Sequence, residues 1–200
     1  MHPHIHARNM PDKAAYIMAT SGETVTYAQL DARSNQIAHL IRATGLKRGD
    51  AIGICMENNV HYFEICWAAQ RAGLYFTCIS SRLTASEVAY ILGDCNAKIF
   101  FASDYLSDMA AELKTLMPDL KGYFITGKAI DGYTSYVEAR NAHPETPIDD
   151  ESRGLDMLYS SGTTGRPKGI RRPLPDGAIE DTDALILLVQ GLYSLSLIHI

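Results

Sequence analysis

The feature that most constrains the fold is an alternation of short apolar runs with helical segments. The runs DAIGICM, LYFTCIS, AKIFFAS and KGYFITG begin at Asp50, Leu74, Ala97 and Lys121. Continuous apolar runs of this length are typical of strands that lie in the interior of a sheet. Because helical segments separate them, the pattern predicts an α/β fold, a mainly parallel sheet flanked by helices.

The segments around these runs carry helix signals. A helix is predicted from about Tyr27 to Thr44, after a short strand in ETVTYAQL and before the stop residue Gly45. A second helix covers VHYFEICWAAQRAG, and a later one covers YLSDMAAELKTLMPDL. Thr84 and Glu87 have the spacing of a capping box, which predicts that another helix begins there. The polar stretch NAHPETPIDDESRG predicts a surface linker over 141–153, before a further strand in GLDMLYSS.

Charge argues against a nucleic-acid partner. The chain has 18 basic and 23 acidic residues, a formal net charge of −5, and no basic stripe. The short cationic run Lys168, Arg171 and Arg172 belongs to one loop and suggests a small anion.

The cysteines indicate a reducing environment. Cys55, Cys66, Cys78 and Cys95 lie far apart, form no C-x-x-C pair and sit in apolar runs. This pattern predicts reduced thiols, mostly in the core, in a cytoplasmic protein.

Both ends of the sequence differ from the middle. The N-terminus has no apolar stretch typical of a secretory signal. Its residues His2, His4 and His6 could bind a metal adventitiously, but a frayed terminus is the interpretation we prefer. Segment 184–200 has no charged side chain and is slightly shorter than the ~20 apolar residues of a membrane span. We expect a buried helix there that is cut off, with no integral membrane span.

The stretch YSSGTTGRPKG, residues 159–169, predicts a phosphate-binding loop. Neither the dinucleotide fingerprint nor the Walker pattern fits it. Its glycines let backbone N–H groups converge on an anion, its hydroxyls can donate to phosphate oxygens, and its lysine adds a charged contact. The alternative is a solvent-exposed Gly/Thr loop, but so many specified positions in a row favour phosphate. The candidate phosphate-binding residues are Ser160, Ser161, Gly162, Thr163, Thr164, Gly165, Lys168 and Gly169.

The same stretch resembles the phosphate-loop signature of the adenylate-forming (AMP-binding) superfamily, which includes acyl-CoA synthetases, peptide-synthetase adenylation domains and luciferases. The similarity extends upstream through TYAQLDARSNQIAHLIRATGLKRGDAIGICMENN and AAQRAGLYFTCISSRLTASEVAYILGDCNAKIFF, and covers about Pro11 to Gly169. Among the branches, these segments look more like a fatty or related carboxylic acid:CoA ligase than a peptide-synthetase module.

The resemblance implies ATP-dependent activation of a carboxylic acid to an acyl-adenylate, followed by transfer to CoA. It implies that the loop holds the β- and γ-phosphates with help from Mg²⁺. The family's adenine, ribose and metal residues and its catalytic lysine lie further along. We therefore expect residues 1–200 to be part of an adenylation domain, an N-terminal portion inactive alone, without catalytic or metal residues.

Three interpretations remain open at this point. One is the ligase portion just described, with 191–200 as a truncated or frame-shifted end. A stand-alone nucleotide- or polyphosphate-binding module would need affinity without the missing adenine site. The third interpretation is a structural or membrane-tethered protein whose segment 184–200 inserts into a bilayer.

Overall fold

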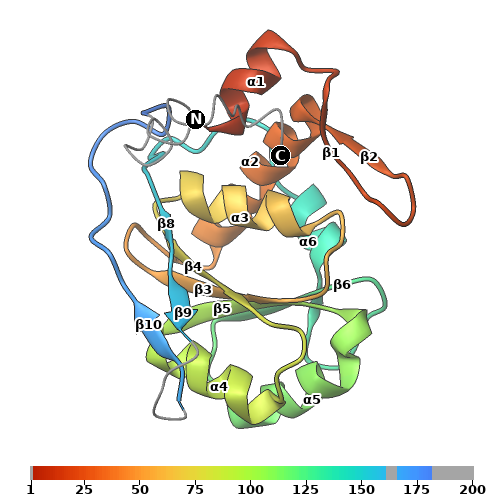
Figure 1. The fold of residues 1–200 in the computed structure, drawn as a ribbon, viewed down its shortest axis with the longest axis vertical. Helices are drawn as coiled ribbons and strands as arrows, with labels where there is room; N and C mark the ends of the chain where they lie inside the picture. Colours follow the sequence, from red (N-terminus) through yellow and green to blue (C-terminus); the bar gives the residue numbers. More distant parts are fainter. Residues whose placement is uncertain (1, 161–165, 182–200) are drawn as a thin grey trace.

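The computed structural model describes residues 2–160 and 166–181, and within these ranges its centre is a six-stranded sheet (Figure 1). The strands lie in the order β7-β6-β5-β3-β4-β8, and every neighbouring pair is parallel. The predicted apolar runs form its four central strands, and two short strands lie at the edges. The six are β3 (Ala51–Cys55), β4 (Tyr75–Ile79), β5 (Ala97–Ser103), β6 (Gly122–Thr126), β7 (Thr134–Ser135) and β8 (Leu155–Asp156).

Helices cover both faces of this sheet, which confirms the predicted fold class (Figure 1). The side chains of β5 point alternately into the two hydrophobic cores, one on each face of the sheet. Ile99 and Phe101 belong to the core under one set of helices, and Phe100 and Ala102 to the core under the other. One layer contains α2 (Tyr27–Ala43), α3 (Tyr62–Arg71) and α6 (Tyr136–Asn141), and the opposite layer contains α4 (Ala85–Asp94) and α5 (Ser107–Leu116), which the 3₁₀ turn η1 (Asp104–Leu106) precedes.

The predicted helix signals work as expected. At the start of α4, the Thr84 side chain accepts from the backbone N–H of Glu87, and the Glu87 carboxylate accepts from the backbone N–H of Thr84 at 2.8 Å. Gly45 and Gly73 follow α2 and α3 with φ of 79° and 68°, the left-handed conformation that glycine adopts without a steric cost. These local interactions fix where the helices begin and end.

The expectation of a frayed N-terminus is wrong. Residues Pro3–Asn9 form α1, and His2, His4 and His6 are all buried. The His2 ring lies edge-on to Trp67 of α3 with centroids 5.1 Å apart, and burial lowers its pKa to about 2. No cluster of three or more potential ligands that suits a metal occurs in the described part of the chain. The His6 ring lies 4.9 Å from the Tyr27 ring of α2, so the N-terminal histidines are packed against the fold.

The hairpin of β1 (Ala14–Ile17) and β2 (Thr24–Thr26) follows α1 and pairs antiparallel. It contains the short strand expected in ETVTYAQL. The segment 141–153 is mostly exposed, as a surface linker should be, but it is tied along α2. Asn35, Gln36 and His39 contact the backbone oxygens of Glu145, His143 and Thr146 at 2.7, 3.0 and 2.9 Å. The connection is thus anchored to the fold rather than a free linker.

Two of the four cysteines depart from the expected core positions. Cys55 and Cys95 are buried, whereas Cys66 is partly buried and Cys78 is exposed. All four thiols are free. No helix in the described ranges has the length and apolar character needed to cross a membrane. The apolar segment 184–200 lies outside the described residues.

A buried carboxylate joins the three helices of one layer. The side chain of Glu64 on α3 is fully buried. Its Oε1 accepts from the Tyr136 hydroxyl at 2.6 Å and from Arg140 Nη1 at 2.9 Å, both on α6, and lies 2.8 Å from His61 Nδ1. Its Oε2 lies 3.7 Å from Arg33 of α2. Burial and the neighbouring Glu64 carboxylate raise the pKa of Tyr136, so its hydroxyl keeps the proton that it donates.

Replacing this carboxylate should strongly destabilise the protein. We expect Glu64→Gln to lower the free energy of unfolding by about 3–5 kcal/mol, because Arg140 and Arg33 lose the charge that compensates them. Urea unfolding followed by circular dichroism measures the loss, and Glu112→Gln on exposed α5 surface is the matched control. Equal midpoints for the two variants would contradict the role given to Glu64.

Candidate functional site

The predicted phosphate loop connects the two strands of a hairpin. Strands β9 (Leu158–Ser160) and β10 (Lys168–Ile170) pair antiparallel, with Ser160 opposite Lys168 and Tyr159 opposite Gly169. Directly opposed residues have Cβ atoms roughly 4.5–5.5 Å apart, so the pairing holds both ends of the loop together. Ser160 and Lys168 are both exposed at this neck. Of the other candidate residues, Ser161, Gly162, Thr163, Thr164 and Gly165 lie outside the described residues.

Gly169 has a packing reason to be glycine. A Cβ atom at this position would lie 2.4 Å from the Met157 side chain and 2.9 Å from the Tyr159 ring. A larger residue would therefore require the Met157 or Tyr159 side chain to move. The sequence suggested that Gly169 frees a backbone N–H for an anion, and this role stays a prediction beside the packing reason for glycine.

Helix α4 forms hydrogen bonds with β9 and with the residue just before β10. The sequence did not reveal these contacts. The Tyr159 hydroxyl donates to Asp94 at 2.5 Å, and burial together with this carboxylate raises the pKa of Tyr159. The Tyr90 hydroxyl donates to the backbone oxygen of Pro167 at 3.2 Å. Both tyrosines were visible in the sequence, but nothing local shows that Tyr90 meets a residue 77 positions later.

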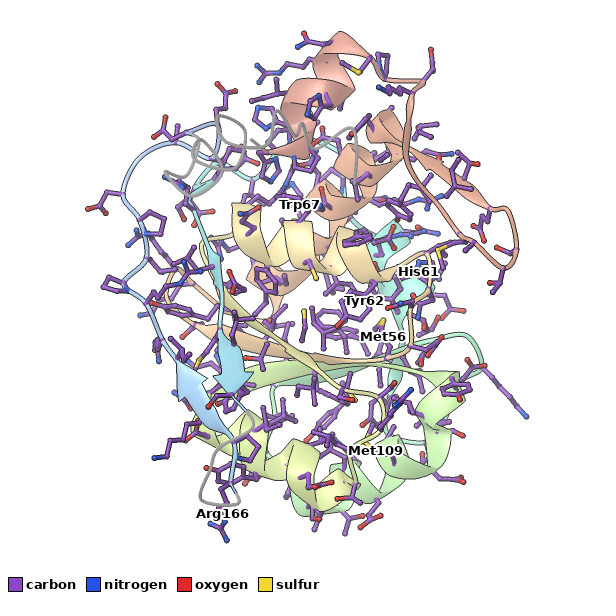
Figure 2. All side chains as sticks on the ribbon, viewed as in Figure 1. Met56, His61, Tyr62, Trp67, Met109 and Arg166 are labelled. Carbon is purple, nitrogen blue, oxygen red and sulfur yellow. The ribbon has the colours of Figure 1, made fainter. Side chains whose placement is uncertain are left out.

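Arg166 and Lys168 are the cations nearest the loop. The Arg166 side chain is exposed and projects from the hairpin tip (Figure 2), with its guanidinium 5.4 Å from the centre of the Tyr90 ring. Lys168 lies at the start of β10. The hairpin can therefore present positive charge and a hydroxyl on opposite strands around one anion.

The other two members of the predicted cationic run have structural partners instead. Arg171 donates to the backbone oxygen of Gly49 at 3.0 Å and lies over the Tyr75 ring at 4.3 Å. Arg172 pairs with Asp156 at 2.9 Å. These contacts fasten the segment after β10 to the amino ends of β3 and β4. Of the three cations predicted to contact a small anion, Arg171 and Arg172 have these partners within the protein. Lys168 is therefore the one that we keep as a candidate for binding the anion.

A second polar feature lies at the opposite, carboxyl ends of β3 and β4. The strand order turns back between β3 and β5, because α3 and α5, which follow these strands, lie on opposite faces of the sheet. The carboxyl ends of strands at such a switch point are where open α/β sheets bind ligands. The Ser103 hydroxyl donates to the Glu57 carboxylate there. A hollow of about 430 Å³ is lined by Met56, Glu57, Asn58, Tyr62, Cys78, Ile79, Ser80 and Ser81.

Comparison with known proteins identifies the family. A family model described as "AMP-binding enzyme" matches residues 4–173. The fatty acid–[acyl-carrier-protein] ligase ScoC of Streptomyces coeruleorubidus is 32% identical over 169 residues, 82% of this chain and 31% of ScoC. The 3-oxocholest-4-en-26-oate–CoA ligase of Rhodococcus rhodochrous is 30% identical, over 80% of this chain and 30% of that ligase.

Solved structures agree with the sequence relatives. The anthranilate CoA ligase AuaEII, in complex with anthranoyl-AMP, superposes with a TM-score of 0.73 at 25% identity, covering 84% of this chain and 33% of AuaEII. The N-terminal domain of FACL13 from Mycobacterium tuberculosis gives a TM-score of 0.71 at 25% identity, covering 84% and 42%. This chain spans about a third of the length of the curated relatives that it matches. With a family match over most of its length and the same sheet, the chain belongs to the AMP-binding, adenylate-forming enzymes.

Proposed function

We propose that the complete protein containing this chain activates a fatty acid with ATP and transfers it to CoA. In the first step a carboxylate oxygen attacks the α-phosphorus, forming an acyl-adenylate and releasing pyrophosphate. In the second step a thiolate attacks the acyl carbon and AMP leaves. The observation that carries the proposal is the β9–β10 register, which places Ser160 opposite Lys168 at the neck of the family's phosphate loop.

The hairpin suits a role in holding phosphate. The strand pairing and the Tyr159 and Tyr90 hydrogen bonds fix the neck before any ligand arrives. Preorganised donors of this kind stabilise the negative charge that develops on a departing pyrophosphate. Lys168 supplies the charged contact and Ser160 a hydroxyl donor. Mg²⁺ screens phosphate charge in such reactions. The described part of this chain contains no cluster of potential ligands that suits a metal ion, so we assign no Mg²⁺ ligand here.

The thiol acceptor has two candidates. CoA is favoured by the ligase names of several relatives, among them FadD13 of Mycobacterium tuberculosis, which is 27% identical over 80% of this chain. An acyl carrier protein is favoured by ScoC, whose name specifies that acceptor. Thioester assays with each acceptor in turn distinguish them. A module that binds nucleotide or polyphosphate without ligase activity would bind ATP and give neither thioester. We also propose a cytoplasmic location, supported by the four free thiols.

Replacing Lys168 tests the phosphate role. In the complete protein, Lys168→Ala should slow acyl-adenylate formation by about ten- to a hundredfold, because one charged hydrogen bond contributes roughly 1.5–3 kcal/mol. Fatty-acid-dependent exchange of pyrophosphate into ATP measures this step. The control is Lys128→Ala, which removes an exposed lysine on a loop after β6. Equal exchange rates in the two variants would remove Lys168 from the site.

We further expect the 200-residue chain by itself to form no thioester. The described residues offer the neck of a phosphate loop but no identified group that orients the carboxylate against the α-phosphorus. Orientation can supply ~7–11 kcal/mol of the barrier reduction, so its absence should abolish turnover. Thioester formation is measured over short to long acids, with an active relative such as ScoC as the positive control. Turnover by the chain at a comparable rate would show that these 200 residues suffice.

A further inference from the structure

Two of the four thiols form a pair. Cys66 on α3 and Cys78 on β4 have Sγ atoms 3.9 Å apart, the distance of a weak thiol hydrogen bond. Cys78 is exposed and Cys66 partly buried, whereas Cys55 and Cys95 are buried. The chain therefore contains one solvent-accessible dithiol and two buried thiols that serve as internal references.

The surroundings of the pair favour reaction at Cys78. Tyr62 precedes Cys66 by one helical turn, so the two side chains share a face of α3. Cys78 and Tyr62 line both the hollow at the carboxyl ends of β3 and β4 and an adjoining one of about 560 Å³. A small reagent can therefore reach the Cys78 sulfur. The hydrogen bond from Cys66, aided by Tyr62, lowers the pKa of Cys78 to about 7, while the same bond, together with burial, raises the pKa of Cys66.

We propose that Cys66 and Cys78 are a thiol–disulfide modification site that reacts with low-molecular-weight disulfides. The Cys78 thiolate attacks one sulfur of the disulfide, forming a mixed disulfide and releasing one thiolate. Cys66 then gives up its proton and attacks Cys78 Sγ, which releases the second thiolate. The two protein thiols lose two electrons, and the reagent becomes two thiols that carry the two protons.

Geometry permits the second step. The sulfurs must approach from 3.9 Å to about 2.05 Å, the length of a disulfide bond. We expect rotation of the two side chains about their Cα–Cβ bonds to bring the sulfurs together, because this motion leaves the backbones of α3 and β4 in place. Because low-pKa, accessible thiols attack disulfides fastest, Cys78 is the nucleophile and Cys66 the resolving thiol.

The test uses the reduced 200-residue chain and oxidised glutathione. We expect two of the four thiols to be lost, no glutathione to remain on the protein, and full recovery with dithiothreitol. Trypsin together with glutamyl endopeptidase cuts after Arg71 and at Glu57 and Glu64, which separates Cys55, Cys66 and Cys78 into different peptides. Mass spectrometry should then find peptide 65–71 joined to peptide 72–82.

Serine variants assign the two roles. Cys66→Ser should retain one glutathione on Cys78, and Cys78→Ser should lose no thiol under the same conditions. Cys95→Ser, the matched control in the core, should form the Cys66–Cys78 bond like the parent. The pH midpoint for alkylation of Cys78 should lie near 7 in the parent and move upward in Cys66→Ala, because alanine leaves no donor at this position. Four thiols left intact, glutathione retained by the parent, or a bond to Cys55 or Cys95 would each overturn the proposal.

Discussion

The buried Glu64 carboxylate is the interaction on which one whole layer of the molecule depends. Three helices distant in sequence, α2, α3 and α6, meet at this single side chain through Arg33, His61, Tyr136 and Arg140. An unpaired buried carboxylate costs several kcal/mol, so the layer is stable only when its partners are all in place. The arrangement fixes how α2 and α6 sit relative to α3, because a small displacement of any helix would leave a charge without a partner.

On the opposite side of the sheet, hydrogen bonds without an ion pair hold the candidate site. Tyr159 and Tyr90 tie the hairpin to α4, and the backbone N–H of Met157 donates to Phe76 of β4 at 2.9 Å. The hairpin is therefore supported by one helix, α4, and by one strand of the central sheet, β4. A loop held in this way keeps its two ends in place whatever the conformation of the residues between them.

Local patterns predicted the sheet and most helix boundaries, since apolar runs and the Thr84 capping box act through neighbours in the sequence. Long-range contacts escaped prediction. The N-terminal histidines contact residues that are distant in the sequence. The His2 ring packs against Trp67, and His4 Nε2 lies 2.7 Å from Glu180. The segment 141–153 was predicted as a surface linker, and its anchors escaped prediction because they are side chains on α2. For the candidate site, the sequence named Ser160, Lys168 and Gly169 as candidates, and these roles stay predictions. It did not show that Tyr159 and Tyr90 hold the hairpin, and no pattern paired Cys66 with Cys78.

The way α3 is held also decides how the dithiol can close. Near its start, α3 is fixed by Glu64, and at its end the buried Arg71 pairs with Asp31 at 2.5 Å and lies 3.5 Å from Glu151. Strand β4 is paired with β3 along its whole length, from Tyr75 to Ile79. With both elements restrained, neither can slide by the almost 2 Å that separates a 3.9 Å contact from a disulfide bond without breaking buried ion pairs or ladder hydrogen bonds. Side-chain rotation is the inexpensive route, so oxidation should change the shape of the hollow beside Tyr62 while leaving the sheet and the hairpin as they are.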